Sequence, residues 1–227
     1  MRYILFDLDG TLTESGEGIM NSAEYAFRAM GREVPDRSEL RTFVGPPLSE
    51  SFPRYGFTKE ETVEAIRQFR VYFKDRGWKE NKPYEGIVPL CAKLAHNGYY
   101  LIVATSKIEN MAQQIIDYFG MGDSFFDVVG SIDGERSTKA EVIAYTLRKH
   151  GISPEDAVMV GDRCFDVEGA ATCGIATVGV TYGYGTRAEL EEAGAVCVVG
   201  SVEELGDYLG TVPNPSVVYN MNVWSEE

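Results

Sequence analysis

The chain has 227 residues, 44% of them hydrophobic and 25% charged, which is typical of a globular protein of one domain or one and a half. No apolar run approaches the about 18 residues of a membrane span, no signal peptide is evident, and the four cysteines share no CxxC spacing, so the sequence predicts a cytoplasmic protein. The 35 acidic residues outnumber the 21 basic ones, for a net charge of −14, which disfavours binding to nucleic acid or to an anionic membrane.

The first predicted strand, Tyr3–Phe6, precedes a long stretch in which no further strand is evident. Within this stretch, Gly18–Met30 and Lys59–Arg76 each place apolar side chains on one helical face. We therefore predict an all-helical cap over residues 15–83, inserted into a core made of residues 1–14 and 84–227. A cap in that place would lie over the ends of the core strands, where a lid belongs.

Beyond the insertion, short runs rich in Val, Ile and Leu alternate with helical patterns, several of which end before a glycine. The predicted strands are Tyr99–Ala104, Asp127–Gly130, Ala157–Val160, Thr177–Val180 and Ala195–Val198. The predicted helices are Pro89–Asn97, Asn110–Phe119, Lys139–His150, Phe165–Cys173, Arg187–Ala193 and Val202–Leu209. This alternation favours an α/β fold with a doubly wound parallel sheet, whose ligands bind at the carboxyl ends of the strands.

Two acids separated by one residue, Asp7 and Asp9, follow the first predicted strand directly and precede Gly10. Both carboxylates can turn toward one cleft, and Gly10 permits backbone angles that expose N–H groups to an anion. An isolated pattern of this kind is also compatible with a polar strand end and a simple turn. Its interpretation depends on which residues follow the other strands.

Further polar residues follow the other predicted strands or begin the next helix. Thr105 and Ser106 can hold a phosphoryl oxygen through a hydroxyl and a free N–H, or simply cap a helix. Lys139 lies in the first turn of a helix, where the dipole disfavours a cation, so we predict an anionic partner for it rather than a solvated position. Asp162 and Asp166 are four residues apart and would share a face of an opening helix, unless Asp162 is only its N-cap.

These groups together predict chemistry on a phosphate ester. Oxygen ligands without His or Cys are those that Mg²⁺ prefers, and the cation would offset the carboxylates enough for a dianionic phosphate to approach. A carboxylate that attacks phosphorus in line forms an aspartyl-phosphate, which water then hydrolyses. The sequence therefore predicts a Mg²⁺-dependent enzyme that acts on a small phosphorylated metabolite.

The motifs FDLDGTLT, Thr105, Lys139 and GDRCFD resemble, in order and spacing, those of the haloacid dehalogenase (HAD) superfamily of hydrolases. This resemblance implies a Rossmann-like core with a small helical cap. It implies that Asp7 is the nucleophile and that Asp9 is a general acid and then a base. It also implies that Mg²⁺ is held by Asp7, the backbone carbonyl of Asp9, and Asp162, while Asp166 orients Lys139 or a metal-bound water. The residues expected to bind the substrate phosphate are Gly10, Thr105, Ser106 and Lys139.

Within this superfamily, Phe43–Leu48 and Thr181–Gly185 are similar to segments of bacterial phosphoglycolate phosphatases. We therefore expect phosphoglycolate phosphatase-like hydrolysis of a phosphomonoester. Thr105-Ser106-Lys107 stands where that group has Thr-Asn-Lys, and Lys139-Ala140 where it has Lys-Pro. Nucleoside 5′-monophosphates, sugar phosphates and pyrophosphate therefore stay open as substrates.

Three alternatives belong to other reaction classes. A dehalogenase has no leaving-group oxygen to protonate and would not need Asp9. A phosphomutase would have to shield its aspartyl-phosphate from water. A non-enzymatic phospho-receiver carries its acceptor on a middle strand of a shorter chain. We expect a monomer or a homodimer, and the tail Thr211–Glu227 is compatible with an edge strand, a partner-binding arm or disorder.

Overall fold

The computed structural model describes residues 2–211, which form two compact units. One unit is Thr13–Lys82, and the other consists of the described residues before and after it. The predicted alternatives for the C-terminal tail fall on residues beyond Thr211, outside the described part of the chain. Among residues 2–211, no helix combines the length and the apolar character needed to cross a membrane.

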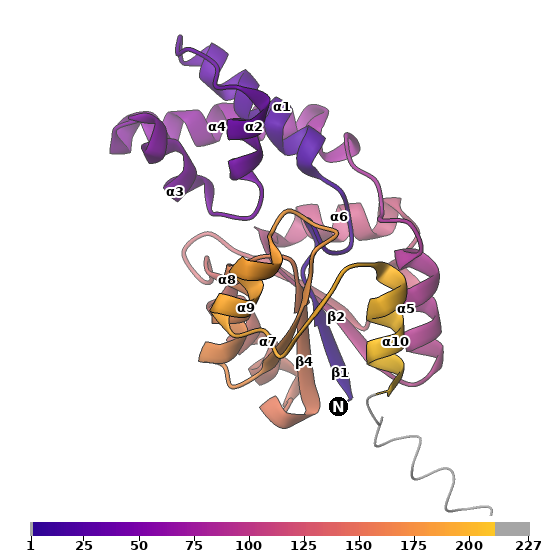
Figure 1. Ribbon diagram of the computed structural model, residues 1–227. Coiled ribbons are helices and arrows are strands. Elements are labelled where there is room, and N and C mark those ends of the chain that lie inside the picture. Colours follow the sequence, from indigo (N-terminus) through magenta and orange to yellow (C-terminus); the bar gives the residue numbers. More distant parts are fainter. Residues whose placement is uncertain (1, 212–227) are drawn as a thin grey trace, which may run out of the picture. The chain divides into compact units, whose positions relative to one another are not determined.

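The first and last described parts of the chain form a sheet of six parallel strands in the order β3-β2-β1-β4-β5-β6. Its central strands β1, β2 and β4 are labelled in Figure 1. The strands are β1 Tyr3–Phe6, β2 Tyr100–Ile108, β3 Asp127–Ser131, β4 Ala157–Gly161, β5 Ala176–Val180 and β6 Cys197–Val199. The chain begins in the middle of the sheet, extends to β3, and then crosses back to β4 on the other side of β1. The predicted doubly wound parallel α/β fold is thereby confirmed.

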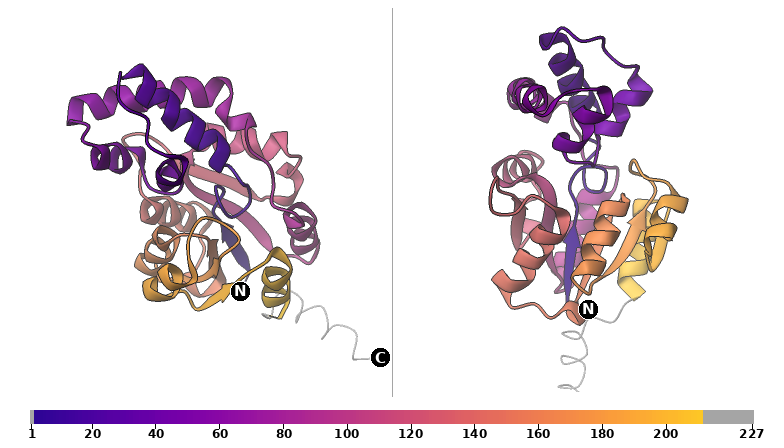
Figure 2. Two further views of the ribbon diagram at one scale, coloured as in Figure 1. Left: turned by 45° about the horizontal axis from the view of Figure 1, so that its top comes forward. Right: turned by 90° about the vertical axis from the view of Figure 1, so that its left-hand side faces the viewer.

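Helices cover both faces of this sheet (Figure 2, right). They are α5 Ile87–His96, α6 Glu109–Tyr118, α7 Lys139–His150, α8 Cys164–Thr172, α9 Arg187–Ala193 and α10 Val202–Thr211. Helices α7, α8 and α9 pack in series, whereas α10 packs against α5. Because both faces are covered, the central strands are continuously apolar: Ile4, Leu5 and Phe6 have no exposed surface.

The inserted unit, Thr13–Lys82, contains only helices (Figure 1). Its main helices, α1 Gly16–Ala29 and α4 Lys59–Asp75, pack against each other. Shorter elements are α2 Arg37–Leu40, η1 Arg41–Phe43, α3 Leu48–Ser51, η2 Phe52–Tyr55 and η3 Gly77–Lys79. Phe27, Phe43 and Phe52 form an aromatic core with ring centroids 5.0 to 6.1 Å apart. The function of this unit as a cap stays a prediction.

Several element ends differ from the prediction by a residue or two, and two differences bear on the predicted site residues. Strand β2 does not end at Ala104 but continues to Ile108, with a register shift against β3 in between. Asp162 does not lie on a helix, because α8 begins only at Cys164. Asp162 therefore cannot share a helical face with Asp166, and it is not the N-cap of α8.

Candidate active site

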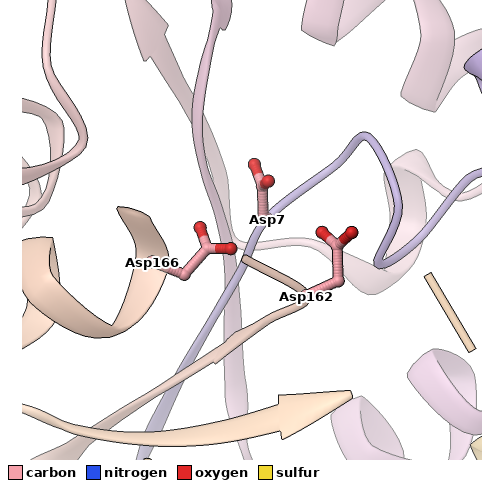
Figure 3. A group of neighbouring side chains, drawn as sticks. All are labelled: Asp7, Asp162 and Asp166. Atoms are coloured by element: carbon pink, nitrogen blue, oxygen red, sulfur yellow. The ribbon is translucent and has the colours of Figure 1, made fainter. Parts of the chain in front are cut away.

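The carboxyl ends of β1 and β4 bring three aspartates together. Strands β1 and β4 are neighbours, so Asp7 after β1 and Asp162 after β4 emerge side by side, and Asp166 comes from the first turn of α8 (Figure 3). One oxygen from each carboxylate lies within 4.8 Å of the others. All three side chains are buried. The fold thus concentrates negative charge where a parallel α/β sheet binds its ligands.

Lys139 is the cation at the centre of this cluster. Its Nζ lies 2.7 Å from Asp7 Oδ1 and 2.8 Å from Asp166 Oδ1, and it donates to the Ala104 carbonyl over 3.0 Å. The capping box of Thr138 and Glu141 begins helix α7 at this residue. The expected anionic partner of Lys139 is therefore present.

Asp162 is held by hydrogen bonds from two loops. Its Oδ2 accepts a hydrogen bond from the Tyr184 N–H over 2.8 Å, and its Oδ1 accepts one from the Thr11 hydroxyl over 3.3 Å. Gly10 adopts φ +87°, and a Cβ there would lie 2.3 Å from Asp162 Oδ2. Only glycine allows the loop after β1 to pass so close to this carboxylate.

The remaining predicted site residues lie around Asp9 and the end of β2. Asp9 is paired with Lys107, whose Nζ is 2.6 Å from Asp9 Oδ2. Thr105 is buried, and its Oγ1 accepts a hydrogen bond from the Lys107 N–H over 3.2 Å. Ser106 is half-buried. The predicted roles of Gly10, Thr105 and Ser106 in phosphate binding stay predictions.

Burial and mutual repulsion disturb the ionisation of the cluster. Burial, assisted by the neighbouring Asp166 and Asp9 charges, raises the pKa of Asp7 to about 6 although Lys139 opposes the shift. Burial and the charges of Asp166 and Asp7 also raise the pKa of Asp162 well above its ordinary value. The carboxylates in turn raise the pKa of Lys139, whose burial alone would lower it. The single positive charge of Lys139 therefore does not balance the negative charge of three buried carboxylates.

This excess of negative charge fits a divalent cation. Asp7 Oδ1 and Asp166 Oδ1 are buried and, within the described residues 2–211, have no hydrogen-bond partner beyond the ion-pair contact of Lys139. Carboxylate oxygens converge without any His or Cys in the group, which is the ligand chemistry of a hard ion such as Mg²⁺. The residues present therefore fit the predicted cofactor.

We expect Mg²⁺ to stabilise the protein more as the pH rises. The pKa of Asp7 is raised to about 6 in the folded metal-free protein, so its contribution to stability is complete below about pH 4 and is lost as the pH rises through about 6. Bound Mg²⁺ offsets that loss because it binds the ionised carboxylates. The gain in unfolding free energy from Mg²⁺ over EDTA, measured in urea, should increase from pH 5 to pH 7.5. A gain independent of pH would contradict the proposed ligands.

Comparison with known proteins identifies the family. The family model described as haloacid dehalogenase-like hydrolase matches residues 4–180, from β1 to the end of β5. The chain belongs to the haloacid dehalogenase-like hydrolase family. The prediction of a HAD-type phosphoric monoester hydrolase is thereby confirmed at the level of the family. The matched region contains the three aspartates and Lys139.

Among solved structures, a predicted phosphatase from Clostridium acetobutylicum superposes on this HAD chain with a TM-score of 0.90 at 45% identity, covering 93% of this chain and 99% of its own. The 5′-nucleotidase of Pseudomonas aeruginosa is 41% identical over 194 residues, which are 84% of this chain and 88% of the relative. The tyrosine-protein kinase PtkA of Mycobacterium tuberculosis is 42% identical over 211 residues, which are 91% of this chain and 72% of the relative.

The sequence did not indicate every residue that shapes the HAD site. Thr11 and the Tyr184 N–H bind Asp162 from loops far apart in the chain, and no local pattern marks such contacts. Lys107 carried a weak signal, because it follows Thr105 by two residues and two such residues share one side of an extended strand. Its contact with Asp9 requires the parallel pairing of β1 with β2.

Proposed function

We propose that this protein is a Mg²⁺-dependent phosphomonoester hydrolase that forms an aspartyl-phosphate on Asp7. The observation that carries the proposal is the contact of a buried Asp7 carboxylate with Lys139, beside Asp162 and Asp166. The Asp7 carboxylate lies next to the Lys139 ammonium. This cation would attract a phosphate group, whose phosphorus the carboxylate can then attack. The cluster also offers oxygen ligands to the metal that a dianionic substrate needs.

Asp7 and Asp9 divide the reaction between them. An Asp7 carboxylate oxygen attacks phosphorus in line, while the bond to the leaving oxygen breaks and that oxygen takes a proton from the Asp9 carboxyl. In the second half, the Asp9 carboxylate removes a proton from water as the water oxygen attacks phosphorus. The bond from phosphorus to Asp7 then breaks, releasing inorganic phosphate and restoring both aspartates.

The other residues of the cluster stabilise charge during these steps. Bound Mg²⁺, held by Asp7, Asp162 and the Asp9 carbonyl, would supply Lewis-acid stabilisation of the phosphoryl oxygens. The Lys139 ammonium would face the charge that develops on the transferred group. Asp166 also contacts the Lys139 ammonium, at 2.8 Å, and it is itself fixed by a hydrogen bond from the Arg163 N–H over 3.0 Å.

The substrate belongs to the small phosphorylated metabolites. Phe43–Leu48 and Thr181–Gly185 support the phosphoglycolate phosphatase-like reading. A second candidate is a nucleoside 5′-monophosphate, because a relative named 5′-nucleotidase is 41% identical along 88% of its length. A cytoplasmic location is in keeping with the free state of all four cysteines and stays a prediction.

The test is phosphate release from a panel of phosphomonoesters, with Mg²⁺ and then with EDTA. The panel contains phosphoglycolate, nucleoside 5′-monophosphates and sugar phosphates, with pyrophosphate as a non-ester comparison. We expect release from the monoesters that EDTA abolishes, with the highest kcat/KM for phosphoglycolate or a nucleoside 5′-monophosphate. Release that is indifferent to EDTA, or no release at all with Mg²⁺ present, would contradict the proposal.

A further inference from the structure

Lys107 brings a second ammonium group, which is largely buried, to the site. The steps assigned to Asp7, Asp9 and Lys139 do not involve it. Its Nζ lies 2.6 Å from Asp9 Oδ2, and the two side chains are only 9% and 14% exposed. The other oxygen, Asp9 Oδ1, is buried and accepts no hydrogen bond from residues 2–211. The two oxygens of Asp9 therefore differ: one is held by a cation and the other is available to a ligand.

The segment that carries Lys107 is fixed against β3. The pairing of β2 with β3 shifts register between Ala104 and Ile108, and such irregularities are common beside active sites. Gly130 on β3 allows a close approach, since a Cβ there would lie 2.5 Å from the Lys107 carbonyl oxygen. The Gly130 N–H donates to the Glu109 carboxylate over 3.2 Å. The backbone from Lys107 to Glu109 is thus held close to β3.

Arg136 completes this attachment by binding both Gly130 and Glu109. Its Nε donates to the Gly130 carbonyl over 2.8 Å, and its guanidinium pairs with Glu109. The guanidinium also packs over the Tyr145 ring at 4.1 Å from the centroid, and Arg136 is only 5% exposed. A buried arginine with this many partners makes a rigid connection, and it fixes the segment that presents Lys107 to Asp9.

We propose that Lys107 is a positioning residue that holds Asp9 Oδ2, so that Oδ1 carries the proton to and from the reacting oxygens. This inference rests on the proposed function, in which Asp9 is the general acid and base. A carboxylate after the end of a strand can rotate about its side-chain bonds, whereas an ion pair to one of its oxygens at 2.6 Å limits that rotation. Loss of the Lys107 charge should slow protonation of the leaving group and activation of water by Asp9. It should not slow the attack of Asp7 on phosphorus.

Substrates with different leaving groups separate these steps. The p-nitrophenolate group departs without a proton, so formation of the aspartyl-phosphate from p-nitrophenyl phosphate does not need Asp9. An alkyl phosphate needs Asp9 in both halves of the reaction. In Lys107→Met we expect the p-nitrophenolate burst to keep its rate within about threefold, whereas its steady state and alkyl phosphate turnover fall by about 10²-fold. After acid quench, Lys107→Met should therefore carry more covalently bound phosphate than the wild type does.

Three further variants make the test specific. Lys107→Arg keeps a cation beside Asp9 and should restore much of the steady-state rate. The double variant Asp9→Asn with Lys107→Met should be no slower than Asp9→Asn alone, because both changes remove the same function. Lys149→Met is the matched control, since it removes a lysine that pairs with Asp127 at 2.7 Å, at the opposite end of strand β3. Lys149→Met should leave the rates with p-nitrophenyl phosphate and with the alkyl phosphate unchanged.

The outcomes separate a failure of the inference from a failure of the proposed function. If Asp9→Asn hydrolyses the alkyl phosphate as fast as the wild type, the role of Asp9 in the proposed function is wrong. If Asp9→Asn is slow but Lys107→Met is unaffected, Lys107 does not position Asp9. If Lys107→Met loses the p-nitrophenolate burst as well, with an unchanged circular dichroism spectrum, Lys107 acts on the phosphoryl group and the inference is overturned.

Discussion

Asp7→Asn should abolish turnover, with kcat at least about 10⁴-fold below that of the wild type on the best substrate of the panel. The amide has nearly the shape of the carboxylate but cannot serve as the nucleophile at phosphorus. The protein should stay folded, because Lys139 retains Asp166 at 2.8 Å and because the substitution removes one charge from a crowded cluster. Phosphate release and urea unfolding of the same preparations measure the two effects.

The matched control for this variant is Asp127→Asn. Asp127 is also an aspartate paired with a lysine, at 2.7 Å from Lys149, but it lies at the amino end of β3. Its replacement should leave kcat within about threefold of the wild type. Equal losses in both variants would mean that Asp7→Asn acts through folding, and full activity of Asp7→Asn would refute the mechanism.

Lys139→Met should cause the largest loss of stability of the substitutions considered. It leaves Asp7 and Asp166 buried without their cation, and breaking a buried pair in this way costs about 3 to 5 kcal/mol of unfolding free energy. Without Lys139 the pKa of Asp7 should lie above about 6, its value with the lysine present. Because a raised carboxyl pKa means that stability is lost as the pH rises through it, the loss should be smaller at pH 5 than at pH 7.5.

Urea unfolding of Lys139→Met at both pH values, in EDTA, measures this loss. Lys149→Met is again the control, because the Lys149 side chain is 39% exposed and such pairs contribute less than about 1 kcal/mol. A loss of the same size in both variants, or a loss that does not depend on pH, would show that Lys139 does not compensate the aspartates.

The sequence predicted the fold well where local signals and tertiary structure agree. Strand β1 spans Tyr3–Phe6 as predicted, because a run that is buried on both faces is continuously apolar. Helix α7 spans Lys139–His150 as predicted, because a capping box begins it. The segment that follows β2 was mispredicted, since Thr105 continues the strand instead of ending it. Pairing with β3 determines where β2 ends, and a local sequence pattern does not contain the pairing of strands.

The sequence predicted most residues of the candidate site but not the contacts between them. Asp7, Asp9, Lys139 and Asp162 stand out because they follow strands or begin helices where such residues need a partner. The structure adds that Lys107 pairs with Asp9 and that the Tyr184 N–H binds Asp162. These contacts join residues about 100 and about 20 positions apart, and only the strand order brings them together.

The most direct test of the mechanism is to trap the phosphoryl group on Asp7. Asp9→Asn should accept the phosphoryl group from p-nitrophenyl phosphate, whose leaving group needs no proton, and should hydrolyse the product slowly because it lacks the base. After acid quench and digestion, mass spectrometry should find close to one phosphate per protein, on the peptide that contains Asp7, and none when Asp7→Asn is added. Release of p-nitrophenolate without phosphorylated protein, or a phosphate on another residue, would contradict the account.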